Sequence, residues 1–197
     1  MNVHSFEIFL RTPDKHNRLL GAALELFESR GVDSVTVPQV AKAAGVATGT
    51  IYLYFKDKTA LVNAVHHYWR NTYNGFVLVP APPGLPTKEE FGRLWQRMVL
   101  FVRTYPRPAR FLDLHQHAAH LAAENQAAEA LFAMRLAEMV ARGQAAGALR
   151  PLPAEVVTAF YWGAAAGLAK FLADDASFDG RTAAETGDAL WRAIAAG

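Results

Sequence analysis

Apolar side chains recur along this chain at intervals of three and four residues, and clusters of proline interrupt the pattern. Such intervals place side chains on one face of an α-helix, whereas a strand needs strict alternation, and no convincing alternation occurs. Proline lacks an amide donor and disfavours helix in the residue before it, which makes Val79–Pro86, Tyr105–Pro108 and Arg150–Pro153 breaks. The chain is predicted to be all-α, with apolar stripes in residues 20–27, 91–105, 128–140, 157–172 and 190–194.

Composition excludes several classes of protein. The 197 residues include no cysteine, which excludes disulfides, Cys-ligated zinc and thiol nucleophiles. A hydrophobic content of 52% is too high for a disordered chain. Residues 71–87 are uncharged but hold four prolines, and the other long apolar run, 156–169, is shorter than the about 20 residues of a spanning helix. The N-terminus lacks the basic stretch of a secretion signal. We therefore expect a soluble, cytoplasmic protein.

The net charge of +2 is small, but its distribution is uneven. Residues 1–75 carry 8 Lys and Arg against 6 Asp and Glu, while the remainder carries 12 of each kind. The N-terminal part is therefore slightly basic, which is only a faint indication of an acidic partner such as nucleic acid.

The segment Thr36–Phe55, TVPQVAKAAGVATGTIYLYF, carries most of the functional information. Thr36 is a suitable N-cap for a short helix, because its hydroxyl can accept from the first free amides. Gly45 can adopt the positive φ that ends such a helix. A second helix is predicted to run from Thr48 to about Phe55. A helix, a short glycine-containing turn and a helix form the helix-turn-helix pattern.

The second of these helices has the chemistry of a DNA reader. Thr48 and Thr50 place hydroxyls near the helix N-terminus, which is the end that enters the major groove. Gly49 leaves room for close backbone approach to a phosphate. Further donors to phosphate oxygens are Tyr52, Tyr54, Lys56 and Lys58. Ile51, Leu53 and Phe55 are expected mostly in the core, with at most one of them facing outward. Asp57 is predicted to cap a helix that runs from Lys58 to about Tyr73.

The motif AxxAGVxxGTxYxYFxxKxxL resembles the signature of the tetracycline-repressor-like (TetR) family of transcriptional regulators. The matching residues are Ala41, Ala44, Gly45, Val46, Gly49, Thr50, Tyr52, Tyr54, Phe55, Lys58 and Leu61. Three positions depart from the family pattern. Leu53 stands where many members have a second aromatic residue, and Val37 and Ala47 stand where many members have polar or basic residues. Base readout there would depend on apolar contact or be absent.

The resemblance implies a three-helix DNA-binding domain, residues 1–75, followed by an effector-binding and dimerisation domain, residues 76–197. It implies a protein without enzymatic activity or cofactor that binds a palindromic operator as a homodimer and represses transcription until a small effector releases it. The DNA contacts that it carries over are Thr36, Thr48, Gly49, Thr50, Tyr52, Tyr54 and Lys58.

The C-terminal helices are candidates for the dimer interface, because Gly163–Gly167 allows two helices to approach closely. Packing within one subunit is the alternative interpretation. The residues expected at the interface are Phe160, Gly163, Gly167, Leu168, Phe171, Trp191 and Ile194.

Aromatic and methionine side chains of the middle helices are candidates for lining the pocket of a small hydrophobic effector, although an ordinary core is the favoured explanation for any one of them. The candidates are Trp95, Met98, Phe101, Phe111, His115, Phe132, Met139, Tyr161 and Trp162.

A second hypothesis comes from a different class of protein. His117, His120 and Glu124 are spaced so that one helix face presents all three, and such side chains can bind zinc. The alternative function is therefore a small all-α metal-dependent enzyme. The sequence shows no nucleophile or orienting group to accompany this cluster, so we expect neither a metal site nor catalysis.

Overall fold

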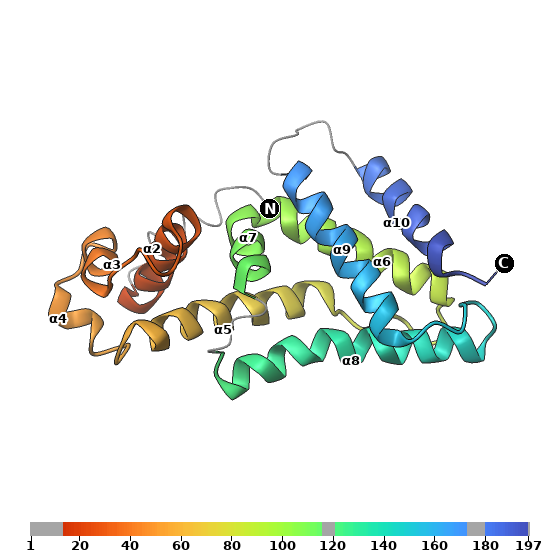
Figure 1. Cartoon of the computed structure of the whole chain (residues 1–197), viewed down its shortest axis with the longest axis horizontal. Helices are drawn as coiled ribbons and strands as arrows, with labels where there is room; N and C mark the ends of the chain where they lie inside the picture. The colour runs from red at the N-terminus through yellow and green to blue at the C-terminus, as the bar shows by residue number, and fades with distance from the viewer. Residues whose placement is uncertain (1–13, 116–120, 173–179, 197) are drawn as a thin grey trace. The chain divides into compact units, whose positions relative to one another are not determined.

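The computed structural model describes residues 14–115, 121–172 and 180–196. Within these ranges the chain forms nine α-helices, and the only β pairing is an isolated bridge between Leu149 and Ala195 (Figure 1). The all-α prediction is confirmed. No helix in the described ranges is both long and apolar enough to span a membrane.

The helices divide into two compact units. The first comprises the described residues of 14–71 and 104–126, and the second comprises residues 72–103 and those described between 127 and 196. One helix, α5 (Lys58–Val77), contributes residues to both units. The boundary predicted near residue 75 lies within this helix.

The first unit contains α2 (Lys15–Arg30), α3 (Val37–Ala43), α4 (Thr48–Ile51), the beginning of α5 and α7 (Pro106–His115). Asp14 caps α2 by accepting from the amide of His16 at 3.0 Å. The apolar face of α2 is buried.

Helix α7 packs against α2 through one apolar and one ionic contact. The rings of Phe27 and Phe111 stack with centroids 6.3 Å apart. Beside them, Arg110 Nε donates to Glu28 Oε1 at 2.6 Å. The sequence predicted only a break at Tyr105–Pro108, but the structure starts α7 at Pro106, because proline fits the first turn of a helix, where no amide donor is needed.

The second unit contains α6 (Thr87–Thr104), most of α8 (Ala123–Ala145), α9 (Ala154–Leu172) and α10 (Gly180–Ile194). Its core is aromatic. The ring of Tyr161 on α9 meets Trp95 edge-on at 5.6 Å and lies 5.0 Å from Phe132. Burial raises the pKa of Tyr161 well above its usual value of 10.0, and nearby Tyr73 adds to this effect. The proline breaks predicted at 79–86 and 150–153 are the connections before α6 and before α9.

Candidate nucleic-acid interface

The turn between α3 and α4 has the geometry that its sequence predicts. Gln39 Oε1 accepts from the amide of Thr36 at 2.8 Å at the start of α3. Gly45 follows α3 with φ of 66°, and the Val46 amide donates to the Ala41 carbonyl at 3.0 Å. A positive φ costs glycine nothing because it has no Cβ. The chain thus reverses within a few residues, and α4 begins at Thr48.

Helix α4 is shorter than predicted. It ends at Ile51, and the chain continues as tight turns in which the amides of Leu53 and Tyr54 donate to the carbonyls of Thr50 and Ile51. Ile51 is fully buried and Phe55 is 4% exposed, so these two side chains anchor the segment to the core.

The side chains between these two anchors point outward. Tyr52 and Tyr54 are about half exposed, and Leu53, at 83%, is the most exposed large apolar residue of the described chain. The prediction that at most one of the three apolar residues faces outward agrees with the structure. The signal was in the spacing, because Leu53 lies two residues from each anchor and a helical turn sends it to the opposite side.

The other candidate contacts surround this exposed segment. Thr36, Thr48, Gly49 and Lys56 are exposed, while Thr50 is half-buried. No atom would lie within 4 Å of a Cβ added at Gly49, so its backbone is open to approach.

Neighbouring parts of the first unit hold the exposed segment in place. The ring of His16 on α2 lies 5.9 Å from Tyr54 and 5.4 Å from Phe55. Asp57 Oδ1 accepts from the Ala60 amide at 2.7 Å, which confirms the predicted cap of α5. Lys58 Nζ donates to the carbonyl of Asp33 at 3.1 Å, so this ammonium is partly engaged within the chain.

For Val37 the structure favours the alternative without base readout. Its side chain is only 8% exposed and belongs to the buried face of α3. Ala47 is exposed. The assembled surface therefore offers hydroxyls, one free ammonium and one exposed leucine, and carries no carboxylate between Thr48 and Lys56.

Most of the residues proposed for an effector pocket are buried side chains. Trp95, Met98, Phe101, Phe132 and Tyr161 are at most 1% exposed and pack against other side chains of the second unit. Trp162 is half-buried with its ring 4.7 Å from that of Phe132. Phe111 belongs to the first unit, and the side chain of His115 lies outside the described residues. Sequence patterns could not separate core from pocket, since both need apolar side chains.

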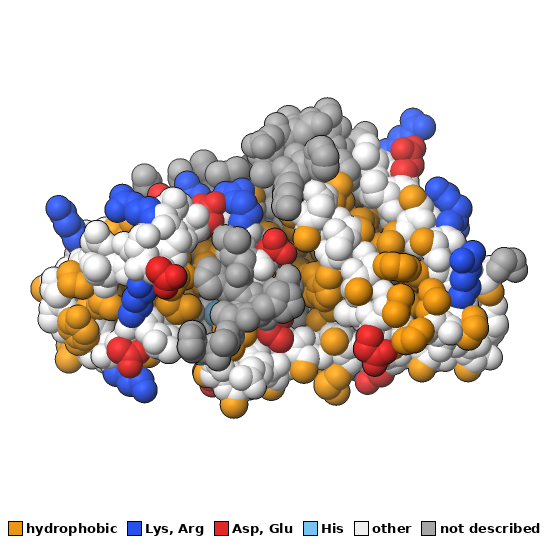
Figure 2. All heavy atoms as spheres, in the orientation of Figure 1, with side chains coloured by type: hydrophobic (Ala, Val, Ile, Leu, Met, Phe, Trp, Pro, Cys, Tyr) orange, Lys and Arg blue, Asp and Glu red, His pale blue; other side chains and the backbone are white. Residues whose placement is uncertain are grey.

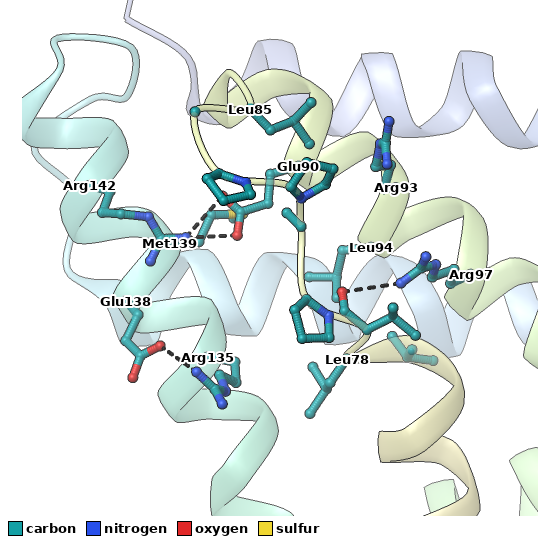
Figure 3. A pocket seen from close by; sticks show the side chains of 17 residues that line it. Leu78, Leu85, Glu90, Arg93, Leu94, Arg97, Arg135, Glu138, Met139 and Arg142 are labelled. Atoms are coloured by element: carbon teal, nitrogen blue, oxygen red, sulfur yellow. Dashed lines mark hydrogen bonds and ion pairs between the residues drawn. The ribbon is translucent and has the colours of Figure 1, made fainter.

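A cavity of about 410 Å³ does occur in the second unit, at a different place. It is formed by the connection between α5 and α6 together with α6 and α8 (Figure 3). Met139 is the only predicted pocket residue that lines it. Sequence reasoning missed its arginines, although Arg93 and Arg97 share one face of α6 and were available as a signal.

The predicted dimer residues divide into two groups. Phe160, Gly163 and Gly167 form an exposed stripe on α9, and hydrophobic side chains gather on this face of the second unit (Figure 2). Leu168 is half-buried. Trp191 and Ile194, by contrast, are 8% and 1% exposed, because they turn toward α6 and the core of their own unit. The side chain of Phe171 lies outside the described residues.

The metal hypothesis depends on residues that the structure does not describe. His117 and His120 lie outside the described residues, and only Glu124 of the cluster is placed. Among the residues that are described, no three His, Asp or Glu side chains are grouped so that they could hold a metal ion.

Comparison with known proteins agrees with the architecture of both units. Residues 19–65 match the family described as "Bacterial regulatory proteins, tetR family". Residues 79–196, more than half of the chain, match "Tetracyclin repressor-like, C-terminal domain".

Individual relatives are similar chiefly in the N-terminal region. YvdT of Bacillus subtilis, an uncharacterized HTH-type transcriptional regulator, is 40% identical over 55 residues, which are 28% of each chain. The HTH-type transcriptional regulator AcrR of Shigella flexneri is 42% identical over 52 residues, 26% of this chain and 24% of AcrR. These alignments thus span about a quarter of the relatives' lengths.

A likeness over nearly the whole chain is found with a solved structure. A TetR family transcription regulator from Marinobacter aquaeolei VT8 superposes with a TM-score of 0.81 over 93% of this chain and 96% of that one, at 23% identity, which shows a common fold. The two family matches, the helix-turn-helix and the helical second unit lead to one conclusion: the chain belongs to the TetR family of DNA-binding transcriptional regulators, which are not enzymes.

Proposed function

We propose that this regulator is a homodimeric repressor that binds a palindromic operator and is released by a small hydrophobic effector. The observation that carries the DNA contact is the segment from Thr48 to Lys56, whose buried side chains Ile51 and Phe55 anchor it to the core while its other side chains are largely exposed. A segment fixed by two buried side chains presents its hydroxyls and ammonium with little loss of conformational entropy on binding.

In this proposal each chemical group has a separate task. The hydroxyls of Thr48 and Thr50 face base edges, whereas Tyr52, Tyr54 and Lys56 donate to phosphate oxygens. Thr36 and Lys58 contribute at the edges of the contact. Gly49 allows the backbone to approach a phosphate. The exposed Leu53 suits apolar contact with a thymine methyl group.

Dimerisation is proposed through α9, whose exposed stripe comprises Phe160, Gly163 and Gly167. A two-fold axis would place the two copies of the segment Thr48–Lys56, called the reading segment below, on the two halves of a palindrome. The copies would lie about 34–36 Å apart when the half-sites are one helical turn apart. Because its target is operator DNA, the protein is proposed to act in the cytoplasm.

Ligand control is proposed to act by shifting the population of dimer conformations toward one with a different spacing of the reading segments. Helix α5 is suited to this coupling, because its residues 58–71 belong to the first unit and 72–77 to the second.

The experiment is a gel-shift titration of the purified protein with the promoter region next to its own gene. We expect a sequence-specific complex that weakens as salt rises, because phosphate contacts release counterions. Tyr52→Ala should weaken the complex, and Tyr68→Ala, a tyrosine substitution outside the segment, is the matched control. Absence of any salt-sensitive, sequence-specific shift would contradict the proposal.

A further inference from the structure

The cavity of about 410 Å³ in the second unit has two unlike walls. One is the connection between α5 and α6, whose prolines carry no amide donor, with Leu78 and Leu85 on either side of them. The other is formed by α6 and α8, which contribute Leu94, Met139 and four arginines (Figure 3). The volume lies within the range of sites for small organic molecules.

Two of the four arginines are compensated by carboxylates. Arg142 Nη2 lies 2.7 and 2.9 Å from the two carboxylate oxygens of Glu90. Arg135 Nη1 lies 3.2 Å from Glu138 Oε2. Figure 3 shows both pairs on the side of the cavity formed by α8.

The other two arginines have no carboxylate partner among the residues that the structure describes. Arg97 Nη1 donates to the carbonyl of Val79 at 3.1 Å, and a carbonyl does not neutralise its charge. Arg93 makes no hydrogen bond or ion pair with any residue that the structure describes. These residues lie one turn apart on the same face of α6. The cavity lining therefore has an excess of two positive charges.

We infer that this cavity binds a small organic anion, namely a carboxylate attached to an apolar body. The planar guanidinium group matches a carboxylate with two parallel hydrogen bonds, and Arg97 has donors left after it has bonded to Val79. The apolar body lies against the prolines and Met139, where the prolines offer no amide donor to a neutral polar ligand. An organic cation is excluded by the charge of α6.

The inference refines the proposed effector, and in that respect it rests on the proposed function. The cavity wall formed by residues 78–85 directly follows α5 in the chain, and Arg97 bonds to the carbonyl of Val79 in this wall. A ligand that engages Arg97 therefore acts on the segment that continues α5.

The test uses calorimetric titration of the full-length protein without DNA. The probes are 2-naphthoate and decanoate, each paired with its neutral amide, so that only the charge differs within a pair. We expect saturable binding of at least one acid and at least tenfold weaker binding of its amide. Arg93→Gln and Arg97→Gln should each weaken binding of the acid by about tenfold, the value of one hydrogen bond to a charged group.

The matched control is Arg103→Gln. Arg103 is an exposed arginine of the same helix that does not line the cavity, so its loss should leave the affinity for the acid unchanged. Circular dichroism identifies any variant that fails to fold, and the other α6 variant then decides.

Three results would overturn the inference: equal binding of acid and amide, an equal loss in Arg103→Gln, or no saturable binding of any probe at millimolar concentration. The proposed function fails separately. If the acids bind as expected but do not release operator DNA, the anion site is confirmed, and control of DNA binding through this site is contradicted. If no operator complex forms at all, the calorimetric result is unaffected.

Discussion

Gly187 on α10 lies directly against the indole of Trp95 on α6. A Cβ added at Gly187 would approach Trp95 Cδ1 to 2.6 Å, a distance that real Cβ atoms do not show. The same indole donates from Nε1 to the Ala183 carbonyl at 3.0 Å and to Thr186 Oγ1 at 3.1 Å. Trp95 is thus fixed by hydrogen bonds and cannot move aside without losing them.

Gly187→Ala is therefore predicted to destabilise the protein, although alanine is the better helix former. Overpacking a fixed aromatic ring costs about 1–3 kcal/mol. Urea unfolding followed by circular dichroism measures the change. Gly75→Ala on α5 is the control, because nothing lies within 4 Å of its added Cβ, and we expect it to be neutral or stabilising by up to about 1 kcal/mol. An equally stable Gly187→Ala variant would contradict this packing of Gly187 against Trp95.

Gly45 between α3 and α4 gives a second prediction, which concerns the backbone. Its φ is 66°, and no atom lies within 4 Å of an added Cβ, so the cost of a substitution is conformational. Gly45→Ala should cost about 1–2 kcal/mol, and Gly45→Asn less, because asparagine tolerates this region better. The order of the urea-unfolding midpoints of the two variants tests this prediction. A larger loss of stability for Gly45→Asn would show that the space around the side chain, and not φ, determines the cost of substitution.

The raised pKa of buried Tyr161 predicts that the protein loses stability at alkaline pH. Its pKa is raised well above 10.0 in the folded chain, mainly by burial, so the folded state keeps the phenol proton after an unfolded chain would release it. The contribution of the protonated Tyr161 to the free energy of unfolding is therefore complete below pH 10. As the pH rises above 10, this contribution falls by about 1.4 kcal/mol per unit of pH. The free energies of unfolding of the wild type and of Tyr161→Phe should differ by a constant amount below pH 10 and by an amount that changes with pH above it. A constant difference at all pH values would contradict the prediction.

The comparison of sequence with structure separates local from long-range information. The turn at Gly45, the cap at Asp57 and the outward direction of Leu53 follow from spacing and backbone chemistry within a few residues, and all three were predictable. The end of α4 at Ile51 was not, because helix propensity continues through Tyr52 and the turn there depends on how Phe55 is anchored.

Long-range packing explains the remaining differences. Trp191 and Phe160 are both aromatic residues on apolar stripes, yet Trp191 is buried against Phe91, with ring centroids 5.7 Å apart, while Phe160 is 46% exposed. Helical spacing identifies a stripe but not the surface that covers it. The basic cavity was hidden for the same reason, since its arginines are brought together with the proline segment only by the fold.

The exposed stripe of α9 gives a prediction about the oligomer. Phe160→Arg should weaken the dimer and leave the fold of the subunit intact, because the side chain is nearly half exposed in the single chain. Leu100→Arg is the control, since Leu100 is 53% exposed on α6, outside the stripe. Sedimentation velocity over a range of concentrations measures the dissociation. A dimer that survives Phe160→Arg but is lost with Leu100→Arg would place the interface elsewhere.

Lys56 provides a quantitative test of the DNA contact. It is exposed, it is the last residue of the segment Thr48–Lys56, and its ammonium makes no ion pair with the described residues. Each neutralised phosphate contributes about 0.9 to the slope of log K against log salt, so removing two copies from a dimer should reduce this slope by about 2. Lys56→Ala should also weaken binding to specific and to non-specific DNA to a similar degree, because phosphate contacts carry no sequence information. Lys88→Ala, which removes an exposed lysine of the second unit paired with Asp188, should leave the slope unchanged. If Lys56→Ala kept the wild-type slope, its ammonium would not lie at a phosphate, and the phosphate contacts would have to be assigned to the remaining groups, Tyr52, Tyr54, Thr36 and Lys58.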